Sequence, residues 1–265
     1  MIHDESLHRY PMLHAGATAF STTRHGGCGS GAYGTFNCTP YTGDEPAVVL
    51  VHQDALCHAL GISAGHLIIP YQTHSCHVLD IDESFMQLSA DARHALLQEK
   101  DALITSLPGV CLCISTADCV PVLLHDPVRH VVAAAHAGWR GTVGNIVAHT
   151  FQAMQESYGT RPSEMYAIIG PCISLTAFEV GIEVYDAFAR ADFDMEQIAQ
   201  WHPEKEKYHI DLPMACRLQL LAAGVLPEAI HDCAICTHTH HRDFFSARRL
   251  GIKSGRVLSG IMLNS

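Results

Sequence analysis

The sequence predicts a mixed α/β fold in a single domain covering residues 1–265. Helix start and stop signals alternate along the chain with short apolar runs bounded by turn residues, as expected when strands and helices pack together. No internal repeat, low-complexity tract or break in composition divides the chain. Of the 265 residues, 48% are hydrophobic, which is enough for a large buried core.

The expected elements can be placed from local patterns. Asp44 and Pro46 begin a helix that Gly61 ends, and Thr142 caps a helix that Gly159 ends. The segment 24–31 holds too many glycines for regular structure and is either an anion cradle or a flexible connection. Strands are predicted over 17–21, 165–169, 229–236 and 256–263, and further helices over 84–98, 180–189 and 212–223.

The central feature is a β-hairpin between Asp101 and Gly144, in which two apolar runs flank the turn 126–129. Asp and Pro at the first two turn positions favour a type I turn. If the strands leave this turn directly, residues whose numbers sum to 255 face each other, so Cys119 opposes His136. Opposed residues have Cβ atoms about 4.5–5.5 Å apart, close enough to share a metal ion. Two-residue hairpin loops prefer primed turns, so a bulge that shifts this register by one residue is the alternative.

Cys119 and His136 therefore predict a zinc site carried by the central β-hairpin. Catalytic zinc has three protein ligands and a water, with sulfur at about 2.3 Å and imidazole nitrogen at about 2.0–2.1 Å. His74 is the leading third ligand because Gln72-Thr73-His74 interrupts an apolar stretch. The alternative for Cys119 is an ordinary buried core thiol.

A second candidate metal site is the cluster Cys233-x-x-Cys236-x-His238-x-His240-His241. The C-x-x-C spacing suits structural zinc, but a complete structural site needs its second ligand pair farther along the chain. The alternative is a solvated, histidine-rich loop.

Charge and composition exclude several classes of partner. Lys and Arg number 16 and Asp and Glu 27, so the net charge is 16 − 27 = −11, which disfavours nucleic acid and anionic membranes. No apolar run approaches the roughly 20 residues needed to span a bilayer, and the N-terminus lacks a signal-peptide pattern. We expect a cytoplasmic protein with reduced thiols; the sequence does not indicate its oligomeric state.

Basic residues are scarce, so the arginines near the candidate site are informative. Arg140 lies in a Gly-Trp-Arg-Gly turn close to His136, and Arg248 follows Phe244-Phe245-Ser246. Guanidinium groups bind anions in a bidentate manner, and both arginines are candidate anion contacts. The absence of a G-x-S-x-G motif argues against a serine hydrolase.

Together these motifs resemble the laccase-domain family, also described as YfiH-like or as a purine nucleoside phosphorylase family. The Ala-Asp-Cys motif followed by His-Ala-Gly-Trp-Arg-Gly is highly specific, and the matches extend over most of the chain in the family's order. The matching segments are Gln72-x-His74, Ala117-Asp118-Cys119-x-Pro121-Val122, His136 to Gly141, Ile169-Gly170-Pro171-x-Ile173, Cys236-Thr237, Phe245-Ser246-x-Arg248-Arg249 and Gly255-Arg256.

The resemblance implies one α/β domain with zinc held by His74, Cys119 and His136. It implies phosphorolysis of adenosine, inosine and methylthioadenosine, together with adenosine deamination. Members have also been described as copper-dependent polyphenol oxidases and as peptidoglycan-editing factors, and a non-catalytic zinc-binding module is a weaker alternative. Copper can enter a thiolate–imidazole site in vitro, because affinities follow the Irving–Williams order.

Phosphorolysis requires anion donors and stabilisation of the leaving purine. We expect Arg140 and Gln72 to act in catalysis and Asn37 and Arg248 to contact the substrate, either the nucleoside or phosphate. The chain departs from the family at His52-Gln53, where many members have Asn-Arg, and at Ala247, where an aromatic residue is frequent.

Overall fold

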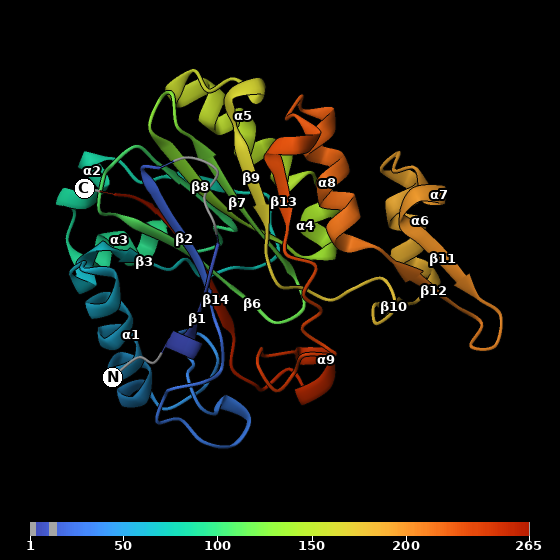
Figure 1. Ribbon diagram of the computed structural model, residues 1–265, viewed down its shortest axis with the longest axis horizontal. Helices are drawn as coiled ribbons and strands as arrows, with labels where there is room; N and C mark the ends of the chain where they lie inside the picture. Colours follow the sequence, from blue (N-terminus) through green and yellow to red (C-terminus); the bar gives the residue numbers. More distant parts are fainter. Residues whose placement is uncertain (1–3, 11–14, 265) are drawn as a thin grey trace.

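The computed structural model describes residues 4–10 and 15–264 and confirms the mixed α/β class (Figure 1). The strands are β1 (Leu7–Arg9), β2 (Ala17–Thr22), β3 (Leu67–Ile68), β4 (Val78–Asp80), β5 (Ala102–Thr105), β6 (Cys111–Thr116), β7 (Val120–Asp126), β8 (Val131–Ala137), β9 (Tyr166–Ile169), β10 (Glu179–Val180), β11 (Ala199–His202), β12 (Lys207–Ile210), β13 (Ile230–Asp232) and β14 (Val257–Leu263). The α-helices are α1 (Pro46–Leu60), α2 (Glu83–Gln87), α3 (Ala90–Leu96), α4 (Trp139–Val143), α5 (Ile146–Tyr158), α6 (Ile182–Arg190), α7 (Met195–Ile198), α8 (Leu212–Ala222) and α9 (Ala247–Leu250).

Within the described ranges the strands form three sheets. The central sheet has the order β13-β9-β7-β8-β5-β4, and the second sheet has the order β1-β2-β14-β6-β3. The small sheet has the order β10-β12-β11 and lies with α6 and α7 at the right of Figure 1, away from the other two.

The central and second sheets pack face to face. Alternate side chains of β8, such as Val132 and Ala134, meet Leu112 and Ile114 of β6 in an apolar layer between the sheets. The opposite face of the central sheet is covered by α5 and α8, and the outer face of the second sheet is covered by α1. Strands β7 and β8 are therefore buried on both faces, which explains their nearly continuous apolar sequences.

The predicted central hairpin is present, but its predicted register is wrong. His136 pairs with Pro121, because the connecting loop has four residues, 127–130, instead of two. Asp126 stays in the strand and its carboxylate accepts hydrogen bonds from Val128 N and Arg129 N at 3.0 Å each. Cys119 lies one residue before β7, so only one of the two predicted ligands is on a hairpin strand. A shift of two residues preserves strand parity, and Cys119 still lies on the His136 side of the chain.

Several predicted elements are confirmed with small changes of boundary. The helix after Pro46 ends at Leu60, with Gly61 in the left-handed conformation (φ 70°), and the strands at β2, β9, β13 and β14 are present. The helix predicted over 180–189 begins at Ile182, because Val180 belongs to β10.

Two predicted helices are each broken in two. The 84–98 segment divides into α2 and α3, because Leu88 is extended and the Ser89 side chain caps a new helix by accepting from Ala92 N. The 142–158 segment divides at Asn145, whose φ of 62° separates α4 from α5. Thr142 is therefore not an N-cap but an internal residue of α4, and its hydroxyl donates to Gly138 O at 3.0 Å.

The hairpin of β11 and β12 was not predicted. Its two strands are four residues each and its turn is highly charged, so the apolar alternation that identifies longer strands is weak. No helix among the described residues is long and apolar enough to cross a membrane.

Candidate active site and metal centre

The three predicted metal ligands come together at one end of the layer between the two large sheets. His136 shares the face of β8 that points toward the second sheet, Cys119 precedes β7, and His74 lies in the loop after β3. One potential donor atom from each lies within 4.8 Å of the others, and Cys119 Sγ is 3.8 Å from His74 Nε2. The rings of His74 and His136 meet edge to face with centroids 4.8 Å apart.

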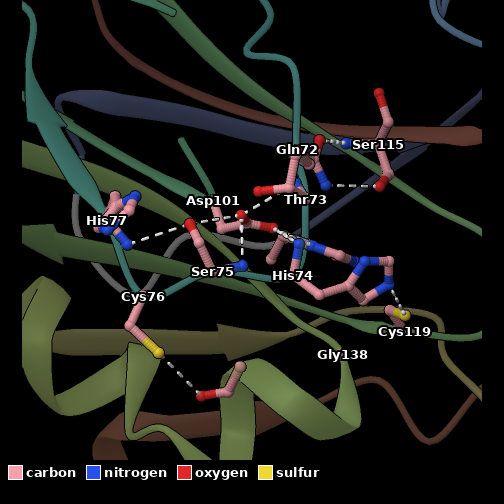
Figure 2. Close-up of polar contacts among 12 residues, drawn as sticks. Gln72, Thr73, His74, Ser75, Cys76, His77, Asp101, Ser115, Cys119 and Gly138 are labelled. Carbon is pink, nitrogen blue, oxygen red and sulfur yellow. Dashed lines mark hydrogen bonds and ion pairs between the residues drawn. The ribbon is translucent and has the colours of Figure 1, made fainter. Parts of the chain in front are cut away.

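Asp101 holds this arrangement together and was given no role from the sequence. Its carboxylate, which is fully buried, accepts hydrogen bonds from Thr73 N (3.1 Å), His74 N (3.0 Å) and Ser75 N (2.7 Å). It also contacts His136 Nδ1 at 2.7 Å. Figure 2 shows Asp101 among Thr73, His74 and Ser75, whose loop surrounds its carboxylate. The carboxylate thus positions two of the three ligands at once.

The backbone of His74 has φ of 62°, a left-handed conformation that is uncommon for residues other than glycine. Three successive N–H groups can point at one carboxylate only because the loop turns sharply here. The signal in the sequence was a carboxylate, Asp101, directly before an apolar strand, but nothing in the sequence indicated its partners.

The carboxylate also determines which nitrogen of His136 faces the other ligands. Since Asp101 can only accept when ionised, Nδ1 carries a proton and donates to it, and Nε2 is the nitrogen that faces Cys119 and can bind a metal once it has lost its own proton. Burial raises the pKa of Asp101, but the hydrogen bond and charge of His136 and the bonds from Ser75 outweigh it and lower the pKa to about 2.

The thiol and the imidazole alter each other's acidity. Burial raises the pKa of Cys119, but the charge of His136 and hydrogen bonds with His136 and His74 lower it to about 6. Burial lowers the pKa of His136, whereas the charge of Cys119 and the hydrogen bond with Asp101 raise it to about 9. At neutral pH the cluster therefore contains a thiolate, the form of cysteine that binds metals.

Cys119 is positioned by the residue before it. Asp118 has φ of 87°, and its carboxylate accepts from Thr237 Oγ1 at 2.7 Å and from Arg248 N at 2.7 Å. Its carbonyl accepts from Ile173 N at 2.9 Å. Three segments distant in sequence thus hold the chain at the point where it enters β7.

Gly138 leaves room for the ligands. A Cβ atom at this position would lie 2.5 Å from His74 Cδ2 and 3.1 Å from Cys119 Sγ, closer than side chains normally approach. Gly138 directly follows β8, where the chain passes close to His74. Any larger residue would therefore push His74 away from the cluster (Figure 2).

The three ligands open into a cleft of about 280 Å³. Two tyrosines, Tyr41 and Tyr71, meet edge to face on its wall with centroids 5.1 Å apart. The cleft is lined by Thr39, Tyr41, Thr42, Pro70, Tyr71, Gln72, His74, Ser115, Ala117, Cys119, His136, Ala247, Ile252 and Arg256.

Gln72, predicted to act in catalysis, lines this cleft, but both ends of its amide are hydrogen bonded to the backbone of β6. Its Oε1 accepts from Ser115 N at 2.7 Å and its Nε2 donates to Ser115 O at 2.9 Å (Figure 2). The side chain therefore attaches the His74 loop to the second sheet, beyond the point where Pro70 interrupts backbone pairing.

Asn37, predicted to bind substrate, is fully buried and is not among the lining residues. Its Oδ1 accepts from Arg256 N at 3.1 Å and from Thr39 N at 3.3 Å, and its Nδ2 donates to Thr42 Oγ1 at 3.1 Å. These three partners do line the cleft. His52 supports the same segment, since its Nδ1 contacts Asn37 O at 2.9 Å.

The two predicted anion contacts lie outside the lining set. The guanidinium of Arg140 lies over the ring of Trp139, 4.1 Å from its centroid. Arg248 donates from Nη1 to Glu179 O at 3.0 Å. The arginine that does line the cleft is Arg256, which belongs to the Gly255-Arg256 motif and was not predicted to contact an anion. Its Nη1 donates to Ser254 O at 2.6 Å, which holds the guanidinium close to its own backbone.

The second candidate metal site, in the loop from Cys233 to His241, does not bring three donor atoms close together. Among the described residues, the group with three closely spaced donors is His74, Cys119 and His136. Cys236 instead accepts hydrogen bonds from Ser174 Oγ at 3.1 Å and Ser174 N at 3.4 Å, and His240 Nδ1 contacts Cys236 O at 3.0 Å.

Comparison with known proteins identifies the family. A family model described as "Multi-copper polyphenol oxidoreductase laccase" matches residues 18–264. The chain belongs to this laccase family. The matched range includes the three predicted ligands, Asp101, Gly138 and every residue that lines the cleft.

Individual laccase-family relatives cover nearly the whole chain. A purine nucleoside phosphorylase of Bacteroides thetaiotaomicron is 49% identical over 264 residues, which are 100% of this chain and 96% of the relative. Adenosine deaminase RL5, from an unknown prokaryotic organism, is 44% identical over 93% of this chain and 94% of its own. The crystal structure of the hypothetical protein YfiH from Bacillus licheniformis superimposes with a TM-score of 0.87 at 29% identity, over 94% of this chain and 93% of that one.

Proposed function

We propose that this chain is a zinc-dependent purine nucleoside enzyme that acts at the His74–Cys119–His136 site. Its reactions are the phosphorolysis of adenosine, inosine and methylthioadenosine, and the deamination of adenosine. The observation that carries the proposal is a thiolate and two imidazoles gathered within 4.8 Å at the base of a cleft. Relatives named purine nucleoside phosphorylase and adenosine deaminase, at 49% and 44% identity, support the substrate class.

The residues present fit zinc. One sulfur and two nitrogens form a donor set typical of catalytic zinc, with a fourth position left for water or substrate. Asp101 supplies the carboxylate that commonly orients a ligating histidine. Zinc bound here would contribute Lewis acidity that stabilises negative charge developing on a reactant.

The cleft has separate features for the two parts of a nucleoside reaction. Tyr71, which is 42% exposed, and Tyr41 offer aromatic surface for a purine base, a contact worth about 1–3 kcal/mol. Arg256 provides positive charge for phosphate on the same cleft. In phosphorolysis a phosphate oxygen forms a bond to the anomeric carbon as the glycosidic bond breaks, and the purine leaves with a proton. Base and phosphate therefore need to bind on either side of the sugar.

Gln72 and Asn37 act in this proposal by positioning. Gln72 fixes the loop that carries His74, and Asn37 fixes Thr39, Thr42 and the backbone of Arg256. Deletion of either amide should therefore change the geometry of the cleft before it changes any direct contact with substrate.

A copper polyphenol oxidase is the weaker function for this site, although the family description names one. Four-electron reduction of dioxygen by such enzymes uses a mononuclear copper and a trinuclear cluster. The set of two histidines and one cysteine could hold one ion. Copper that enters the site in vitro would therefore produce oxidase activity without defining the physiological reaction.

The proposal is tested with protein prepared without added metal. We expect about one zinc per chain, and we expect adenosine with phosphate to give ribose 1-phosphate together with adenine or, after deamination, hypoxanthine. Cys119→Ser should lose the zinc and these products while retaining its circular dichroism spectrum. If zinc-loaded protein leaves adenosine and inosine unchanged but releases an amino acid from a muramyl-peptide precursor, the proposal is wrong and the editing activity takes its place.

A second experiment separates the two arginines. Arg256→Gln should raise KM for phosphate about 10–100-fold, because it removes a charge-assisted contact worth about 1.5–3 kcal/mol. Arg140→Gln, matched in chemistry but stacked over Trp139, should leave KM for phosphate within about twofold. The reverse result would return the anion contact to Arg140, as the sequence predicts.

A further inference from the structure

The small sheet carries two histidines and a glutamate, side chains of types that bind metals, one from each strand. Glu179 of β10 is the direct cross-strand partner of His209 of β12, and Gln200 of β11 is the partner of His209 on its other side. His202 lies two residues after Gln200 and so points to the same face. Glu179, His209 and His202 therefore project side by side from adjacent strands.

His209 is oriented as a ligating histidine would be. Its side chain is 2% exposed, and its Nδ1 lies 2.9 Å from Leu175 O, a carbonyl that can only accept. Nδ1 therefore carries the proton, and Nε2 presents its lone pair. Nε2 is buried and has no hydrogen-bond partner, which is costly for a polar atom unless a ligand satisfies it.

His202 repeats this pattern. Its Nδ1 lies 3.2 Å from Glu204 Oε1, a carboxylate that orients the ring, and its buried Nε2 again has no hydrogen-bond partner. The rings of His202 and His209 lie 4.0 Å apart between centroids and are inclined by 37°. Two unsatisfied imidazole nitrogens are thus held on neighbouring strands of one sheet face.

A carboxylate completes the set. Glu179 Oε2 is 3.8 Å from His209 Nε2, too far for a hydrogen bond but close to the separation of about 3.3 Å between two ligands that share a tetrahedral zinc at 2.0–2.1 Å. The side chain of Glu179 is 36% exposed, so it can move and the position is open to solvent. Its present partner is Lys205, whose Nζ lies 3.3 Å from Oε2.

We propose that His202, His209 and Glu179 form a second binding site for a divalent transition-metal ion such as Zn²⁺. Two imidazoles and one carboxylate are a common zinc donor set, and the fourth position would hold water. These donors are less closely gathered than those of the first site, so binding requires Glu179 to exchange Lys205 for the metal. The ion would join all three strands of the small sheet.

The site has a direct route to the cleft region. The carbonyl of Glu179 accepts from Arg248 Nη1 at 3.0 Å, and Arg248 N donates to Asp118, the residue before Cys119. A metal that restrains Glu179 would also restrain this connection.

The test is a titration with Co²⁺, a spectroscopic substitute for zinc. Cobalt bound by a thiolate gives a near-ultraviolet charge-transfer band, whereas cobalt bound by imidazole and carboxylate gives only visible d–d bands. We expect about two equivalents per chain in the wild-type protein. His202→Gln and His209→Gln should each bind about one equivalent with the charge-transfer band unchanged, and Cys119→Ser should lose that band and keep the second equivalent.

His149→Gln is the matched control, because His149 is an exposed histidine on α5. It should bind as many equivalents as the wild-type protein. His202 is 24% exposed and tolerates substitution better than His209, so a His202 variant covers failure of the His209 variant to fold. Wild-type protein that binds only the thiolate-linked equivalent, or His202 and His209 variants that bind as much as the wild type, would overturn the proposal. The charge-transfer band reports separately on the first site, so either site can fail alone.

Discussion

His136 and His209 are both buried histidines whose Nδ1 atoms are hydrogen bonded, but the acceptors differ. His136 donates to the ionised Asp101 carboxylate, which is itself held by three backbone N–H groups. His209 donates to the neutral carbonyl of Leu175. A charged acceptor makes the imidazole a stronger base and resists reorientation more than a neutral one does.

The third donor of each site, Cys119 in the first and Glu179 in the second, differs in the same way. Cys119 is held through Asp118 by three separate segments, whereas Glu179 is a half-exposed side chain paired with an exposed lysine. The donor atoms of the first site are already gathered without a metal, whereas those of the proposed second site would have to reorganise on binding. We therefore expect the first site to bind zinc more tightly, and the following experiments test that contrast from the largest expected effect to the smallest.

Asp101→Asn should have the largest effect on the first site. The amide cannot accept from His136 and all three N–H groups at once, so metal affinity should fall about 10–100-fold. The free energy of unfolding should fall by about 1–3 kcal/mol, because buried donors lose an acceptor. Calorimetric metal titration and denaturant unfolding measure the two quantities.

Asp126→Asn is the control for this variant. Asp126 is also fully buried and also accepts from backbone N–H groups, but it lies at the turn end of the same hairpin. It should lose comparable stability and keep full metal affinity. Equal loss of affinity in both variants would mean that general destabilisation, not orientation by Asp101, explains the result.

Gly138→Ala should have a smaller effect that is also confined to the first site. The added methyl group would lie 2.5 Å from His74 Cδ2, so His74 must move away from Cys119. We expect zinc affinity to fall about tenfold, or ~1.4 kcal/mol, with little change in fold. Gly65→Ala is the control, since the nearest atom to its added Cβ is 4.0 Å away. Unchanged affinity in Gly138→Ala would show that the ligands are more mobile than their contacts indicate.

A change of one pH unit should alter zinc affinity about as much as Gly138→Ala does, and it reports the protonation of the first site. With the pKa of Cys119 lowered to about 6 and that of His136 raised to about 9, the thiol is already ionised between these values and the imidazole is protonated. Zinc must displace the imidazole proton, so affinity should rise about tenfold per pH unit from pH 6 to 9. Below pH 6 the thiol is also protonated and the dependence should steepen.

Calorimetry in buffers of different ionisation enthalpy counts the released protons directly. About one proton per zinc is expected near pH 7.5, and none in Cys119→Ser at the first site, because that variant does not bind there. Release of no proton by the wild-type protein would contradict the thiolate–imidazolium pair.

The gathering of the three predicted metal ligands could be anticipated from the sequence, because Cys119 and His136 are chemically unusual residues in or beside apolar strands and His74 interrupts an apolar stretch. The register that brought Cys119 opposite His136 was wrong, since the turn contains four residues and Cys119 precedes its strand. The two residues are still close together, because a shift of two residues leaves side chains on the same face of a strand.

Other parts of the site depend on the directions in which side chains point, which a single sequence does not show. From the sequence alone, Asp101 is only a polar residue at the start of a predicted strand. The folded loop shows that its carboxylate faces three N–H groups. Arg140 is close to His136 along the chain, but α4 directs its guanidinium over Trp139. The small sheet was missed because its strands are short, so the alignment of His202 with His209 could not be inferred either.

The hydrogen bonds accepted by Asp101 limit where the chain can gain or lose residues. Backbone N–H groups of the loop 72–75 bind the carboxylate of Asp101, which directly precedes β5. A residue gained or lost in the loop or at the start of β5 would therefore break these hydrogen bonds. The intervening segment, with α2 and α3, contributes no side chain to the metal cluster. Insertions should therefore be tolerated near the break between these helices at Leu88, which is 37% exposed, and not within a few residues of His74.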